Sequence, residues 1–149
     1  MTASGIGLLF TYAGALGLLF QLPVTHATMR MSGFAIVLWS GATQAVAFVC
    51  LVLSPALPSL IAAVTLLALS QMLSGPLVQT IVSELAPRSR QATYQATFSV
   101  VSDLKDAAGP AIGTWLYALS AALPWASGAV ISAAAALALA VAAHKHEKR

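Results

Sequence analysis

Three charged residues, Asp103, Lys105 and Asp106, stand close together inside a long apolar stretch of the chain. If this stretch crosses a membrane, each charge costs on the order of 3 kcal/mol or more, so residues of this kind usually have a function. Asp103 and Asp106 are three positions apart and would share one face of a helix. Because two carboxylates in a low dielectric repel each other, one of them is expected to bind and release a proton.

The same three residues also fit a purely structural role. Lys105 can run its apolar stem back toward the nearer membrane surface and keep its ammonium group in water. The two acids can pair with arginines of the preceding loop, Arg88 or Arg90. The sequence therefore predicts either ion pairing or proton coupling at this cluster, and both interpretations stay open.

Two glycine–proline pairs, Gly75-Pro76 and Gly109-Pro110, fall in the middle of apolar stretches. Each proline removes a backbone hydrogen bond and is expected to kink its helix. Broken helices in membranes often line transport cavities, although proline is also simply more frequent in membrane helices. Gln71 and Ser74, just before the first pair, are our candidates for contacting a small molecule in such a cavity. Most polar residues of this kind only hydrogen-bond to a neighbouring helix.

The composition excludes a soluble domain. Of 149 residues, 59% are hydrophobic and 7% are charged, whereas about a quarter of the residues of a soluble domain are charged. The net charge of +3 is spread over several loops, so no basic stripe suggests nucleic acid. No catalytic constellation, metal-ligand spacing or phosphate-binding motif occurs, so we expect no enzyme, no metal and no cofactor.

Five apolar stretches are each long enough to cross a bilayer as a helix. Turn signals separate them, and we expect the first to close at Pro23 and Thr25. The abundance of Ala and Leu favours helix over strand. We therefore predict an all-α transmembrane bundle forming a single domain over residues 1–149. Its predicted spans are residues 5–24, 34–53, 59–82, 97–119 and 125–143.

Basic residues occur only in every second gap between these stretches. Since Lys and Arg are retained on the cytoplasmic side, this alternation predicts that the N-terminus lies outside and the C-terminus in the cytoplasm. We expect an integral protein of the plasma (inner) membrane, surrounded by lipid. The residues of the cytoplasmic side are Arg30 in the first gap, Glu84, Arg88 and Arg90 around the third, and Lys145, Lys148 and Arg149 in the tail.

Three segments of the chain resemble a known family. Residues 83–90 read Ser-Glu-Leu-Ala-Pro-Arg-Ser-Arg, and residues 102–113 read Ser-Asp-Leu-Lys-Asp-Ala-Ala-Gly-Pro-Ala-Ile-Gly. With residues 7–24, these stretches resemble the C-terminal half of a major facilitator superfamily transporter, in the drug/proton-antiporter-like branch. The loop at residues 25–32 departs from the family pattern because it lacks the usual Gly and Asp. The resemblance implies that the five spans are helices eight to twelve of a twelve-helix fold.

The resemblance also implies a function. We expect a part of a transporter that exports small molecules by alternating access, driven by protons and working with an N-terminal half. The first seven helices of the family are not present in this sequence. The alternative is a truncated or non-transporting membrane protein that serves as a helical partner in another complex. Partners would then be the bilayer, a second membrane protein and, for a transporter, a small-molecule substrate.

Overall fold

The chain folds into long α-helices joined by short turns. The computed structural model describes residues 3–54 and 56–147, with side chains described for residues 4–54 and 56–138. No strand occurs among them, so the predicted all-α class is confirmed. The helices are α1 (Ala3–Thr28), α2 (Gly33–Leu53), α3 (Leu57–Leu85), the short 3-10 helix η1 (Arg88–Arg90), α4 (Gln91–Leu119) and α5 (Leu123–Glu147).

Not every helix is apolar enough to mark it as a membrane span. α4 has 29 residues, but its three charges and its hydroxyl side chains lower its hydropathy. The apolar part of α5 within the described side chains is short, at Leu123–Ala138. Three of the five predicted spans therefore coincide with helices that are long and apolar enough to cross a membrane, and membrane crossing by all five helices stays a prediction. By length and composition, the segments able to cross a membrane are Ser4–Thr28, Gly33–Leu53 and Leu57–Leu85.

The first helix runs past the proline that we expected to end it. α1 continues through Pro23 to Thr28. An internal proline removes one hydrogen bond without ending a helix when other groups compensate. The Thr28 hydroxyl lies in the last turn, where it donates to the carbonyls of Val24 (3.0 Å) and Thr25 (2.9 Å) and stabilises the end of the helix.

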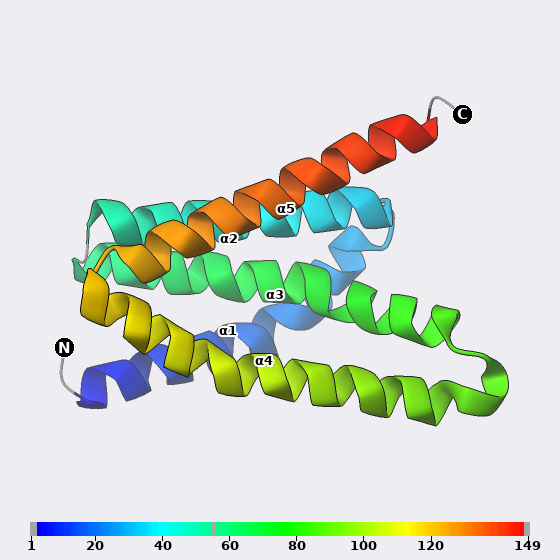
Figure 1. Cartoon of the computed structure of the whole chain (residues 1–149), viewed down its shortest axis with the longest axis horizontal. Coiled ribbons are helices and arrows are strands. Elements are labelled where there is room, and N and C mark those ends of the chain that lie inside the picture. Colours follow the sequence, from blue (N-terminus) through cyan, green and yellow to red (C-terminus); the bar gives the residue numbers. More distant parts are fainter. Residues whose placement is uncertain (1–2, 55, 148–149) are drawn as a thin grey trace.

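The helices pack around α2 and α3. α2 contacts both α3 and α5, and α1 lies against α3 (Figure 1). A buried cluster of Ala47, Leu51 and Ala63 joins α2 to α3, with Trp125 of α5 packed against it. By contrast, α4 contacts α3 and α5 only sparsely and buries none of its residues. α4 is therefore held only weakly in the bundle.

Small residues allow close packing between α2 and α5. A Cβ added at Gly41 would lie 3.1 Å from Ala136, and one added at Gly128 would lie 3.0 Å from the Phe48 ring. Such close backbone approach is typical of helix pairs in membranes. In α1 and α4, by contrast, a Cβ added at Gly14, Gly17, Gly109 or Gly113 would meet open space.

The two ends of the bundle differ in charge. In Figure 1 the turn after α1, the loop between α3 and α4 and the end of α5 lie at one end. The start of α1 and the turns after α2 and α4 lie at the other end. The first end carries Arg30, Arg88 and Arg90, all exposed, whereas the turns of the other end carry no charge. The side chains of Lys145, Lys148 and Arg149 lie outside the described residues.

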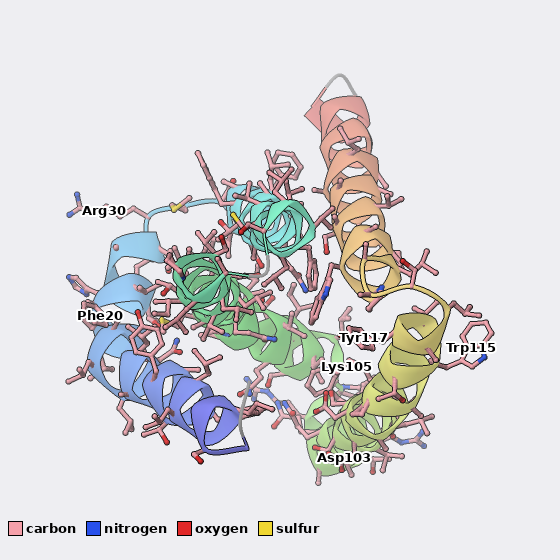
Figure 2. All side chains as sticks on the ribbon, turned by 90° about the vertical axis from the view of Figure 1, so that its left-hand side faces the viewer. Phe20, Arg30, Asp103, Lys105, Trp115 and Tyr117 are labelled. Carbon is pink, nitrogen blue, oxygen red and sulfur yellow. The ribbon has the colours of Figure 1, made fainter. Side chains whose placement is uncertain are left out.

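Large apolar side chains cover much of the outer surface. Phe20 of α1 and Trp115 of α4 point away from the other helices in Figure 2. Leu18 and Leu22 of α1 are 88% and 80% exposed. A surface of this kind is unfavourable in water and is suited to a lipid environment.

Candidate functional site

The charged residues of α4 form an ion pair between neighbours in the sequence. Lys105 Nζ lies 3.1 Å from Asp106 Oδ1, and both side chains are 70% exposed. Asp106 is therefore paired with Lys105, and neither Arg88 nor Arg90 pairs with it within the described part of the chain. Sequence reasoning named these residues but did not foresee this pairing.

The ion pair borders a large cavity of the bundle, and Asp103 does not. The cavity has a volume of about 720 Å³ and lies between α2, α4 and α5. Lys105 and Asp106 stand at its wall beside Gly109 and Pro110. Figure 2 shows Lys105 on the side of α4 nearer the other helices and Asp103 on the far side. Only one of the two candidate carboxylates, Asp106, therefore faces the space in which a small molecule would fit.

The second glycine–proline pair stands directly beside the ion pair. Pro110 has no N–H, so the carbonyl of Asp106, four residues earlier, loses its helical donor. Figure 1 shows α4 changing direction in its second half. The Thr114 hydroxyl donates to the Pro110 carbonyl at 2.8 Å on the far side of the break. The charged carboxylate and the broken backbone therefore belong to one short segment of α4.

At the first glycine–proline pair, the backbone carbonyl that the proline leaves free accepts a hydrogen bond from another helix. Pro76 leaves the Met72 carbonyl without its helical donor. The Gln21 amide of α1 donates to this carbonyl at 3.3 Å and to the Thr25 hydroxyl at 3.1 Å. A Cβ added at Gly75 would meet open space. Sequence reasoning missed Gln21, although a polar residue near the predicted depth of a freed carbonyl was a usable signal.

The structure does not bring Gln71 and Ser74 to one site. Gln71 lines a separate cavity of about 430 Å³, whose walls come mainly from α1 and α3. Ser74 instead donates its hydroxyl to the Ser70 carbonyl at 3.0 Å within α3. Ser70 itself is buried against Ser40 of α2, and their hydroxyls lie 3.0 Å apart. Ser74 therefore lies near a contact between helices, whereas Gln71 remains available to a ligand.

The predicted cytoplasmic residues lie at the charged end. Arg30 projects away from the bundle after α1 (Figure 2). Glu84 lines a third cavity, of about 710 Å³, between the ends of α3 and α4. The walls of this cavity are mostly amides and hydroxyls, and Gln95 of α4 donates to the Ser83 hydroxyl of α3 at 2.8 Å. This end of the bundle is suited to contact with water.

Among the residues that the structure describes, no group of three or more His, Cys, Asp or Glu side chains could hold a metal ion. The arrangement is therefore one of ion-pair and hydrogen-bond chemistry beside open cavities, set on long apolar helices. Such features are typical of membrane proteins that bind or pass small molecules.

Comparison with protein families identifies the class. The model of the Major Facilitator Superfamily matches residues 1–149, which is the whole of the chain. The chain therefore belongs to the major facilitator superfamily, whose members are membrane transporters and not enzymes. Comparisons with curated proteins and with solved structures gave no match.

Proposed function

We propose that this chain moves small molecules across the membrane as the C-terminal part of a drug/proton-antiporter-like transporter. In this proposal, helices α1 to α5 correspond to helices eight to twelve of a twelve-helix fold. The observation that supports it best is the Lys105–Asp106 ion pair at the wall of a cavity of about 720 Å³. Charged side chains in a membrane helix of a transporter commonly mark the path of a substrate or an ion.

Asp106 is the proposed proton carrier. When Asp106 is ionised, it holds Lys105 at 3.1 Å. Protonation would neutralise the carboxylate and release the ammonium group, which changes the charge at the cavity wall. α4 buries none of its residues, so a small change in its electrostatic contacts can alter its position. Proton binding would thereby couple to movement of the helix that carries the site.

Transport by alternating access requires two helix bundles that rock against each other around a central site. We propose that a second bundle, equivalent to the N-terminal half of the family, acts with α1 to α5. This bundle can belong to the same polypeptide or to a partner. The sparse contacts of α4 leave a face of the bundle available to it.

We further propose that the end carrying Arg30, Arg88 and Arg90 faces the cytoplasm of a plasma (inner) membrane, with the N-terminus outside. The positive-inside tendency of membrane proteins supports this orientation. Reporter fusions test it, because a phosphatase that is active only outside should work after Ser120 and fail after Arg90. Activity in the opposite pattern would reverse the orientation.

The coupling is tested by transport in vesicles that contain the chain together with an N-terminal half. A pH gradient is imposed, and efflux of fluorescent small organic compounds is followed. We expect Asp106→Asn to abolish the effect of the gradient, whereas the matched variant Asp103→Asn retains it because Asp103 does not line the cavity. Equal, gradient-driven efflux in both variants would contradict proton coupling at Asp106. If no compound is moved by the unaltered pair of halves, a non-transporting helical partner becomes the better account.

A further inference from the structure

A second cavity, separate from the ion-pair site, has walls of a different chemistry. Its volume is about 430 Å³ and its lining comes mostly from α1 and α3. None of the described residues that line it is charged. Its apolar walls include Leu9 and Phe10 of α1, Leu67 and Ala68 of α3, and Trp125 of α5. The volume falls within the range of roughly 300–1,000 Å³ that is usual for small-molecule sites.

Water is a poor occupant of this cavity. An ordered water molecule in an apolar cavity needs two to four polar partners, and among the described side chains that line this open cavity only the Gln71 amide and the Trp125 indole N–H offer one. A charged ligand is also disfavoured, because an isolated charge is costly in apolar surroundings. The walls therefore select for an uncharged and mainly apolar molecule.

Gln71 gives the cavity one point of polar recognition. Its amide makes no hydrogen bond within the described residues, whereas the amides of Gln21 and Gln95 are both bonded to another helix. Gln71 is exposed on the bundle surface, and an amide that faces lipid without a partner is unfavourable. A ligand that brings a hydroxyl or carbonyl group to Gln71 would satisfy it.

We propose that this cavity binds a neutral, mainly apolar small molecule through its walls and pairs its single hydrogen-bonding group with the Gln71 amide. Only the view that this molecule is the transported substrate rests on the proposed transport function. Binding itself depends on the cavity alone. It can therefore be tested without transport.

Two probes of nearly equal shape separate the apolar and polar parts of the site. 4-Bromophenol and 4-bromotoluene differ only in a hydroxyl against a methyl group, and bromine quenches tryptophan fluorescence on contact. The signal comes from Trp125 of the purified chain in detergent, in a background with Trp39→Phe and Trp115→Phe. Both replaced tryptophans are exposed and lie outside this cavity. We expect both probes to quench Trp125, and 4-bromophenol to bind more tightly.

Replacement of Gln71 tests the polar contact. A neutral hydrogen bond contributes about 1 kcal/mol, so Gln71→Leu should weaken 4-bromophenol binding about fivefold and leave 4-bromotoluene unchanged. The matched variant Gln79→Leu removes an amide from the same helix that lies outside this cavity. It should change neither affinity. If Gln71→Leu weakens the binding of both probes equally, or weakens the binding of neither, the assignment of Gln71 is wrong.

Filling the cavity tests its location. Ala68→Phe and Ala13→Phe place a ring in the cavity from α3 and from α1, and each should abolish quenching by both probes. Ala15→Phe adds the same ring at an exposed position of α1 outside the cavity and should leave quenching intact. If one filling variant does not fold, the other decides. Unchanged quenching in a folded filling variant would overturn the site, and proton-driven efflux that depends on Asp106 would then still stand.

Discussion

The hydrogen bond from Gln21 to the Met72 carbonyl should hold α1 against the proline break of α3. Pro76 cannot donate to this carbonyl. Gln21 Nε2 does so from 3.3 Å, and Met72 is only 6% exposed. Gln21→Leu keeps a side chain of similar size but leaves the carbonyl without a donor. We predict that this variant has a lower free energy of unfolding.

The size of the effect can be bounded from both sides. Hydrogen bonds between membrane helices contribute about 0.6 kcal/mol on average and at most about 1.7 kcal/mol. A buried group left without a partner costs roughly 1–3 kcal/mol. Since no N–H of α3 can replace Gln21, we expect a loss near the upper part of the first range, on the order of 1–2 kcal/mol. With Pro76→Ala, the backbone N–H returns, and Gln21→Leu should then cost less than about 0.5 kcal/mol.

Unfolding of the purified protein in mixed micelles, titrated with sodium dodecyl sulfate and followed by circular dichroism, measures these differences. The set comprises the unaltered chain, Q21L, P76A and the double variant, with Q79L as a control for loss of an exposed amide. If Q21L lowers the free energy of unfolding by the same amount with and without P76A, the predicted contact is wrong. In that case Gln21 stabilises the bundle through something other than the carbonyl that Pro76 frees.

The same titration tests two contacts of α2. Gly128→Ala should destabilise the bundle by about 1–3 kcal/mol, because the added Cβ would lie 3.0 Å from the Phe48 ring and overpacking has costs of this order. Gly113→Ala meets open space and should instead stabilise α4 by up to about 1 kcal/mol through helix propensity; equal effects of the two changes would contradict the packing. Ser40→Ala should cost only about 0.6 kcal/mol, because the Ser70 hydroxyl still reaches the Ser40 carbonyl at 3.0 Å. Adding Ser70→Ala removes that remaining bond, so a double variant no less stable than Ser40→Ala alone would show that the pair contributes nothing.

The presence and order of the helices followed from the sequence, whereas their ends did not. Runs of apolar residues mark the part of a helix that lipid would cover, and they say little about where the backbone leaves the helix. α1 thus extends to Thr28 with the help of that residue's hydroxyl, past Pro23. α4 begins at Gln91, six residues before the predicted span at residue 97, because its first turns are polar. A hydropathy profile does not detect helix caps or helical turns that face water.

The residue types of the candidate site could be predicted, and their partners could not. An acid inside an apolar stretch is visible in the sequence, but only the rotation of α4 decides that Asp106 and not Asp103 lines the cavity. The same applies to the glycines. Gly109 and Gly113 have the spacing of a packing motif and face open space, whereas a Cβ added at Gly41, which has the same spacing to Ala45, would lie 3.1 Å from Ala136. Contacts between helices depend on which faces meet, and a single sequence does not encode this in any local pattern.

The three charged residues of α4 are a physical reason for its weak packing. A helix with three charged residues inside it cannot be buried among apolar neighbours without a large desolvation cost. α4 buries no residue, and α1, which carries no Asp, Glu, Lys or Arg, buries none over residues 4–28 either, whereas α2 and α3, which are free of charge in their middle, form the core. Elements that move in proteins come from the parts with the fewest buried contacts. The residues proposed to bind a proton therefore lie on a helix that the rest of the bundle restrains weakly, where a change of charge can alter its position.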